Sequence, residues 1–326
     1  MAIYRSMHEL IGNTPLVELR HIHSFPHVRV WAKMELMNPG GSVKDRTGMS
    51  MIRDAEFNGL LHTGSHIVEA TAGNTGIGIA FAALERGYKV TFVVPEKFSE
   101  EKQVLMRALG ADVINTSAEG GISEAVARAE EILRTNTQAV SLQQFDNPAN
   151  PRVHEETTGK EIIDDLASIG IDAHSIDVFV AGAGSGGTYS GVARKLKSVH
   201  PRVHCVLADP VGSTMGGGEH APYKTEGIGN NFIARTMDMS LVDEIIKVND
   251  EQAFGTSRML AQKEGIIAGS SSGAAVWASI EIARKIHQGE YFSGAPWMPL
   301  EERNQLNIVT LLPDRGDRYF SAHLYE

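Results

Sequence analysis

The sequence is poor in cysteine, in basic residues and in long apolar runs, and each shortage argues against a class of protein. Cys205 is the single cysteine among 326 residues, so no disulfide can form within the chain, which is typical of proteins in a reducing compartment. Asp and Glu (40) outnumber Lys and Arg (30), and the net charge is −10. Because phosphate contacts need clustered basic residues, this balance argues against non-specific nucleic-acid binding.

No apolar run approaches the about 20 residues of a membrane span, and the N-terminal segment MAIYRSMHELIGN lacks the apolar core of a signal peptide. We therefore expect a cytoplasmic protein that does not bind membranes. Cys205 lies in the apolar run VHCVLAD, where we expect a small buried side chain rather than a nucleophile. His21, His23 and His27 lie close together without Cys, Asp or Glu at metal-ligand spacing, so we expect no metal site.

Strand-like and helix-like segments alternate along most of the chain, and this order indicates an α/β fold. Period-two or short apolar patterns predict strands at 27–35, 65–70, 88–95, 111–116, 139–145, 176–181 and 202–209. Helical patterns lie between them, including one capped by Ser99 and one from Val153 to Leu166. The Pro and Asn cluster at 146–151 reads as a junction. We therefore expect two open parallel-sheet α/β units with helices on both faces.

Ligands of open α/β sheets bind at the carboxyl ends of the strands, so the glycine-containing loops that follow strands are the candidate sites. The first stretch is NPGGSVKDR, residues 38–46. Ser42 followed by Asp45 is a variant of the capping box and predicts a helix that begins at Val43. Lys44 then lies at the positive end of the helix dipole, which lowers the pKa of its amine. The stretch alone fits either a reactive amine or an ordinary surface lysine.

Two further loops carry groups that suit anions. In TAGNTG (71–76), hydroxyl and amide groups lie beside the free N–H groups of a helix start, which suits a carboxylate or a simple helix cap. In GAGSGGT (182–188), the glycines let the backbone approach a phosphate. The same loop also matches G-x-G-x-x-G with Asp209 after the next strand, so a dinucleotide-dependent oxidoreductase remains an alternative. Together, a reactive lysine, a carboxylate loop and a phosphate loop are what pyridoxal phosphate acting on an amino acid requires.

Several motifs occur in the order of the cysteine synthase and cystathionine β-synthase family. They are IGNTPLVEL, NPGGSVKDR, EATAGNTGIGIA, QQFDNPANP, GAGSGGTYSGV, EGIGNNFI, AGSSSGAAV and LLPDRGDRYFS. The chain therefore resembles that family over nearly its whole length. The resemblance implies fold type II of pyridoxal-phosphate enzymes, as in the tryptophan synthase β-subunit, with the cofactor pyridoxal 5'-phosphate in a cleft between two domains. It further implies a smaller mobile domain at 40–150 that binds the substrate carboxylate, a larger phosphate-binding domain at 1–39 plus 151–326, and a homodimer.

The resemblance also assigns roles to individual residues. Lys44 matches the lysine that binds the cofactor covalently and acts as the base, Asn74 matches the asparagine at the cofactor ring hydroxyl, and Ser271 matches the serine beside the ring nitrogen. The phosphate loop corresponds to Gly184, Ser185, Gly186, Gly187 and Thr188. The groups around the amino-acid substrate correspond to Thr71, Ala72, Asn74, Thr75, Gln144 and Gly227.

The implied activity is β-replacement, in which a thiol replaces the β-substituent of serine or O-acetylserine. Homocysteine, which yields cystathionine, is slightly favoured over sulfide, which yields cysteine, and we expect the loop at 212–231 to discriminate between them. Two positions depart from the family pattern, since Ala72 replaces a common Ser and Ser270 replaces a common Ile. A family-derived scaffold without catalysis is a third hypothesis beside the enzyme and the oxidoreductase.

Overall fold

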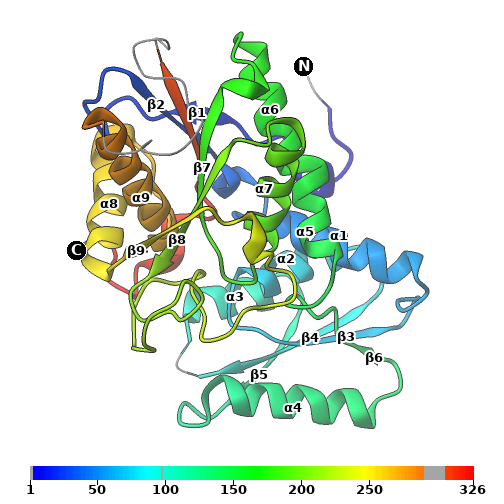
Figure 1. Ribbon diagram of the computed structural model, residues 1–326. Coiled ribbons are helices and arrows are strands. Elements are labelled where there is room, and N and C mark those ends of the chain that lie inside the picture. Colours follow the sequence, from blue (N-terminus) through cyan, green and yellow to red (C-terminus); the bar gives the residue numbers. More distant parts are fainter. Residues whose placement is uncertain (1–2, 97, 290–304) are drawn as a thin grey trace.

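The computed structural model describes residues 3–96, 98–289 and 305–326, which form two sheets surrounded by helices (Figure 1). The larger sheet has the order β1-β2-β10-β7-β8-β9 and the smaller has the order β5-β4-β3-β6. β1 runs antiparallel to β2, and every other strand pair of the described residues is parallel. The predicted parallel-sheet α/β architecture is confirmed.

The strands of the larger sheet are β1 (Leu16–Glu18), β2 (Val28–Lys33), β10 (Leu306–Leu311), β7 (Ile176–Gly182), β8 (His204–Pro210) and β9 (Glu244–Val248). Those of the smaller sheet are β5 (Asp112–Thr116), β4 (Lys89–Pro95), β3 (His66–Ala70) and β6 (Ala139–Val140). The α-helices are α1 (Lys44–Phe57), α2 (Asn74–Ala83), α3 (Glu100–Ala108), α4 (Gly121–Thr135), α5 (Ala149–Val153), α6 (Gly159–Ser168), α7 (Gly187–Val199), α8 (Asp250–Glu264) and α9 (Ser270–His287). Shorter helices are η1 (Met7–Leu10), η2 (Glu35–Met37), the π-turn η3 (His154–Thr158), η4 (Ala173–Ser175), η5 (Met239–Leu241) and η7 (Gly316–Tyr319).

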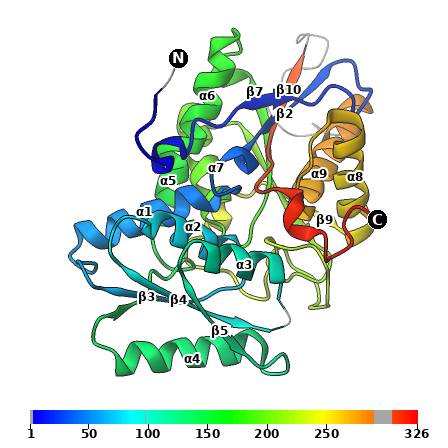
Figure 2. The same ribbon diagram turned by 180° about the vertical axis from the view of Figure 1, so that it is seen from behind.

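Helices cover both faces of each sheet, as Figures 1 and 2 show. In β4, Phe92 and Val94 pack on the side of α1 and α2, whereas Val93 packs with Ala125 and Ala129 of α4. The larger sheet has α8 and α9 on one face and α6 and α7 on the other. Because both faces are covered, β7 is buried from Ile176 to Ala181, and its sequence is apolar throughout except for Asp177.

The predicted strand at 139–145 is wrong beyond Val140. The Glu69 carboxylate, in β3, accepts hydrogen bonds from the backbone N–H groups of Leu142 and Gln143, so these donors are not available for a strand ladder. Gln143 also has a φ of 56°, which is incompatible with an extended strand. The predicted helix at 153–166 is longer than expected, since α5, η3 and α6 follow one another without a break.

Among the described residues, no helix is both long and apolar enough to cross a lipid bilayer. Within the same residues, no cluster of three or more His, Cys, Asp or Glu has the arrangement of a metal site. Cys205 is fully buried in β8, and burial raises the pKa of its thiol to about 12. The structure therefore agrees with the interpretation of Cys205 as a small core residue.

Candidate active site

A cavity of about 430 Å³ brings the three glycine-containing loops together. Two of them follow the carboxyl ends of β3 and β7 and lead into α2 and α7. The residues assigned by resemblance that line this cavity are Lys44, Thr71, Ala72, Asn74, Thr75, Gln144, Gly184, Ser185, Gly186, Thr188, Gly227 and Ser271. Gly187 lies behind the loop, where an added Cβ would come within 2.1 Å of the Asn150 side chain.

Lys44 is the first residue of α1 and reaches the cavity. Burial lowers the pKa of its amine, and the Asp314 and Glu35 carboxylates oppose this effect. Among the described residues, no hydrogen bond or ion pair holds the amine. A half-buried amine with a lowered pKa and no fixed partner is available to react as a nucleophile or a base.

The helix start at Lys44 differs from the predicted capping box. Ser42 Oγ accepts a hydrogen bond from the Lys44 N–H at 3.2 Å, and the Asp45 carboxylate accepts one from the Gly40 N–H at 2.6 Å. The Asp45 side chain therefore stabilises the glycine turn that precedes the helix rather than the cap residue. Val43, the predicted first residue, is the N-cap.

Close packing of α1 on α2 brings Lys44 next to the loop at 71–76. A Cβ added to Gly78 would lie 2.2 Å from the Lys44 carbonyl oxygen, and a Cβ added to Gly48 would lie 2.4 Å from the Gly78 backbone. Larger residues at these positions would force the two helices apart. The glycines of GNTGIGIA therefore serve the approach of the two helices as well as the loop itself.

The loop at 71–76 presents donors to the cavity. The Thr75 hydroxyl donates to Gln144 Oε1 at 2.6 Å, so these two predicted residues form one polar unit. Thr71 and Ala72 line the cavity beside them, and the methyl group of Ala72 packs against the core below α2. The free N–H groups at the start of α2 complete a site that suits a carboxylate.

Asn74, the first residue of α2, is held at both ends of its amide. Its nitrogen donates to Asp314 Oδ2 at 2.6 Å, and its oxygen accepts from the Arg318 guanidinium. Neither partner was identified as a site residue from the sequence. The available signal was the motif LLPDRGDRYFS, which contains both residues.

The loop at 182–188 leads into the N-terminus of α7, a 13-residue helix whose positive dipole end suits an anion. The first N–H of the helix, that of Gly187, donates a long hydrogen bond of 3.4 Å to Ser185 Oγ. Gly186 has a φ of 81°, and a Cβ there would lie 2.4 Å from the Met237 side chain. A Cβ at Gly184 would lie 2.5 Å from the Gly227 carbonyl oxygen. The loop therefore needs glycine for its conformation and its packing, and it fits the phosphate of pyridoxal phosphate.

Asn150 connects two of the loops and was missed as a site residue in the sequence. Its amide donates to the Gln144 carbonyl oxygen at 2.8 Å and to Ser185 Oγ at 3.0 Å. The motif QQFDNPANP that contains Gln144 and Asn150 thus connects the loop at 71–76 to the loop at 182–188.

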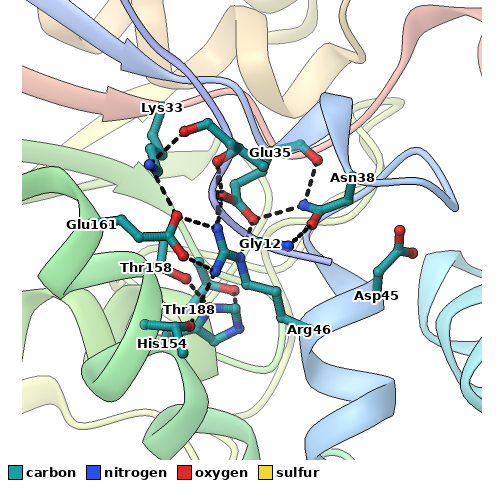
Figure 3. A network of polar contacts seen from close by, with 12 residues as sticks. Gly12, Lys33, Glu35, Asn38, Asp45, Arg46, His154, Thr158, Glu161 and Thr188 are labelled. Carbon is teal, nitrogen blue, oxygen red and sulfur yellow. Dashed lines mark hydrogen bonds and ion pairs between the residues drawn. The ribbon is translucent and has the colours of Figure 1, made fainter. Parts of the chain in front are cut away.

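A buried polar network lies behind the cavity (Figure 3). Arg46 lies between Glu35 and Glu161, and His154 lies beside Thr158 and Thr188. Burial, together with the positive charges of Arg46 and Lys44, holds the pKa of His154 well below its ordinary value. The π-turn η3 thus places a neutral histidine against the Thr188 hydroxyl at 3.2 Å, and no sequence pattern predicted this contact.

Asp209, the residue expected to bind the ribose of a dinucleotide, is engaged in other contacts. Asp209 accepts hydrogen bonds from Lys247 Nζ at 2.6 Å and from the Gly216 N–H at 3.0 Å. It is buried, and it is not among the residues that line the cavity. The carboxylate needed to bind a ribose hydroxyl is thus neutralised by a lysine.

Three comparisons with known proteins agree with this geometry. The model of a family described as pyridoxal-phosphate dependent enzyme matches residues 7–292. The O-acetylserine dependent cystathionine beta-synthase of Bacillus subtilis (strain 168) is 45% identical over 326 residues, which cover 100% of this chain and 99% of that protein. The cysteine synthase of Staphylococcus aureus (strain N315) is 41% identical over 318 residues, which cover 97% and 96%.

Among solved structures, the O-acetylserine dependent cystathionine beta-synthase of Helicobacter pylori superposes with a TM-score of 0.88 at 38% identity and covers 100% of both chains. The match extends over both sheets and the cavity between the loops. The cavity contains a lysine and two glycine-containing loops that each lead into a helix start, and the matches show that the chain belongs to the family of pyridoxal-phosphate dependent enzymes.

Proposed function

We propose that the protein catalyses β-replacement on O-acetylserine, with homocysteine as the preferred thiol and cystathionine as the product. The observation that carries this proposal is the unpaired amine of Lys44 in one cavity with the carboxylate loop and the phosphate loop. The Bacillus subtilis and Helicobacter pylori relatives are O-acetylserine dependent enzymes, which favours O-acetylserine over serine as the donor. In the overall reaction, the Cβ–O bond breaks with its electron pair leaving on acetate, and the thiolate sulfur forms the new bond to Cβ.

In this proposal each loop binds one part of the reactants. The N-terminus of α7 with Ser185, Gly186 and Thr188 holds the cofactor phosphate. The start of α2 with Thr75 and Gln144 holds the substrate carboxylate. When bound, pyridoxal phosphate supplies an electron sink for a carbanion at Cα. The Ser271 hydroxyl beside the ring nitrogen is neutral and cannot hold that nitrogen protonated as a carboxylate would, which favours loss of the β-substituent over transamination.

Lys44 is the proposed base. Its lowered pKa leaves more of the amine neutral near pH 7 than an exposed lysine would allow. The neutral amine removes the proton from Cα of the substrate and returns it after the thiolate has added to Cβ. The Asp314 and Glu35 carboxylates favour the ammonium form that exists between these two transfers.

The preference for homocysteine rests on the loop at 212–231. Its residues from Tyr223 to Asn230 line the cavity and include Lys224 and Glu226, which carry opposite charges. Homocysteine has an amino-acid head group with both charges, whereas sulfide has no such head group, so homocysteine gains more from a surface that carries both charges. Ser270, the second departure from the family pattern, accepts a hydrogen bond from the Glu226 N–H at 3.1 Å and stabilises this loop.

The proposal includes a movable segment at 40–150 that closes on the larger part, 1–39 plus 151–326. The smaller sheet and helices α1 to α4 fall within this segment and have their own apolar clusters. Lys102 of α3 bridges to Glu226 at 2.6 Å, which would hold the closed arrangement. Closure would exclude water from the reacting Cβ. We also propose a homodimer, on the family resemblance alone, to be checked by light scattering.

A competition assay tests the proposed activity. Purified holoenzyme receives saturating O-acetylserine with equal concentrations of homocysteine and sulfide, and mass spectrometry quantifies both products. We expect cystathionine to exceed cysteine, and no product from Lys44→Ala. An excess of cysteine would favour the second candidate, a cysteine synthase, as in the Staphylococcus aureus relative. Absence of both products would refute β-replacement.

A further inference from the structure

The C-terminal segment at 313–319 runs along the loop that carries Lys44. The Val43 N–H donates to the Pro313 carbonyl oxygen at 2.8 Å, and the Arg315 N–H donates to the Gly41 carbonyl oxygen at 3.3 Å. β10 lies between β2 and β7 in the larger sheet, so the residues that follow it emerge at the same edge as the cavity. This segment therefore brings residues from the end of the chain to groups far earlier in the sequence, as in the pair Asn74 and Asp314, which are 240 positions apart.

Two buried charged residues of this segment hold the amide of Asn74. Asp314 is 1% exposed and Arg318 is 4% exposed. Asp314 Oδ2 accepts from the Asn74 amide nitrogen at 2.6 Å and from the Tyr319 hydroxyl at 2.5 Å. Arg318 donates to the Asn74 amide oxygen and also to the Gly40 carbonyl oxygen. The same guanidinium thus joins Asn74 to the turn before Lys44.

The two partners impose a direction on the amide. An ionised carboxylate only accepts hydrogen bonds, and a guanidinium only donates them. If the amide of Asn74 were turned over, its nitrogen would face Arg318 and its oxygen would face Asp314, and both hydrogen bonds would be lost. One N–H of the amide remains free for the cavity, since the other is used by Asp314.

We propose that Asp314 and Arg318 are positioning residues that fix the Asn74 amide so that an N–H, not the carbonyl oxygen, faces the ring oxygen of pyridoxal phosphate. The inference rests on the proposed role of Asn74 at that ring oxygen. A donor at this place stabilises negative charge on the ring oxygen, whereas the amide oxygen would repel it. Asp314 Oδ1 packs closely on Gly269, where an added Cβ would lie only 2.2 Å away, so a larger residue at position 269 would displace the carboxylate.

The test compares Asp314→Asn with Asp317→Asn, a matched control in the same segment whose side chain is exposed. The new amide at position 314 can donate as well as accept, so it no longer imposes one direction on Asn74. We expect Asp314→Asn to shift the visible absorption band of the bound cofactor, measured without substrate, and to lower kcat on the order of tenfold. Asp317→Asn should change neither. Because the band is read without donor or thiol, it tests the positioning role even if the proposed reaction is wrong.

A double-mutant cycle separates positioning from general damage. If Asp314 acts on the cofactor through Asn74, Asp314→Asn adds no further band shift in an Asn74→Ala background. The cycle is read on the band and not on kcat, because the Asp314 carboxylate also acts on the Lys44 amine. Arg318→Lys serves as a second variant, since it keeps the charge but loses the planar group that reaches both Asn74 and Gly40, and we expect the same band shift. An unchanged absorption band in both variants, or an equal band shift from Asp314→Asn with and without Asn74, would overturn the proposal.

Discussion

Replacing Arg46 with Met removes the centre of the buried charge network two residues after Lys44. Arg46 and Glu35 are 2% and 0% exposed at their side chains. The guanidinium donates to both oxygens of Glu35 at 2.8 Å and to both oxygens of Glu161 at 2.6 and 2.7 Å. These bonds connect α1 to η2 and to α6.

The size of the expected loss of stability follows from the hydrogen-bond partners that Glu35 keeps. Without Arg46, the Glu35 carboxylate keeps the Thr14 hydroxyl at 2.6 Å and the Asn38 amide at 2.9 Å, and no cation among the described residues forms an ion pair with it. Removing one partner of a buried pair costs about 3–5 kcal/mol, because the other charge stays buried. We therefore expect Arg46→Met to lower the free energy of unfolding by about 3–5 kcal/mol at pH 8.

The loss of stability in Arg46→Met should depend on pH, and the direction of that dependence follows from the pKa of Glu35. Burial raises the pKa of Glu35, but the charge and hydrogen bonds of Arg46 outweigh burial, and the net pKa is lowered. In the wild type, this group thus contributes stability above the unfolded pKa, which is lost as pH falls through the folded pKa. In Arg46→Met, burial dominates and the pKa rises above its ordinary value. The penalty is then largest at neutral pH and shrinks as Glu35 takes up a proton, so the two proteins converge as pH falls.

Urea unfolding at fixed cofactor concentration measures the effect at pH 8 and pH 5. The control is Arg128→Met, which removes an ion pair to Glu131 with side chains 46% and 50% exposed, and should change stability by less than about 1 kcal/mol. Glu35→Gln combined with Arg46→Met should recover part of the loss. A loss no larger than that of the control, or a difference that grows toward pH 5, would contradict the reasoning.

Three further predictions concern single residues. Gly186→Ala should lower the free energy of unfolding by about 1–3 kcal/mol and weaken cofactor binding, because φ is 81° and the added Cβ would lie 2.4 Å from Met237. Gly218→Ala, with a φ of 92° and open space around the Cβ, measures the backbone contribution alone. Equal effects of the two substitutions in denaturant and cofactor titrations would refute the packing argument. His154→Phe should lower cofactor affinity about tenfold, since it removes the ring nitrogen that lies 3.2 Å from the Thr188 hydroxyl. An unchanged affinity would show that this contact does not contribute to cofactor binding. Cys205 should resist iodoacetamide in the native protein and react after unfolding, because burial raises the pKa of its thiol to about 12; rapid native alkylation, detected by mass spectrometry, would disprove its burial.

Features with a local cause could be predicted from the sequence. The strands predicted at 176–181 and 202–209 correspond to Ile176–Gly182 and His204–Pro210, because a parallel strand buried on both faces leaves a continuous apolar run. Ser99 caps α3 as expected, accepting from the Lys102 N–H. The glycine loops were found for the same reason, since turn geometry and helix starts are encoded within a few residues.

Features caused by distant residues could not be predicted. The strand expected after Val140 is absent because Glu69, more than 70 positions earlier, takes its backbone donors. His154 could not be identified as a site residue from the sequence, because its position depends on the packing of η3 against α7. Helix propensity does not encode that contact. Asp314 and Arg318 reach Asn74 only because β10 inserts between β2 and β7.

Borohydride reduction of the holoenzyme followed by peptide mapping tests most directly whether Lys44 is the covalent anchor of the cofactor. Reduction makes the link between the cofactor and its lysine permanent, so mass spectrometry can locate it after proteolysis. We predict that the added mass lies on the peptide that contains Lys44 and is absent from the Lys44→Ala protein. A label on another lysine, or no label in a protein that binds the cofactor, would contradict the account.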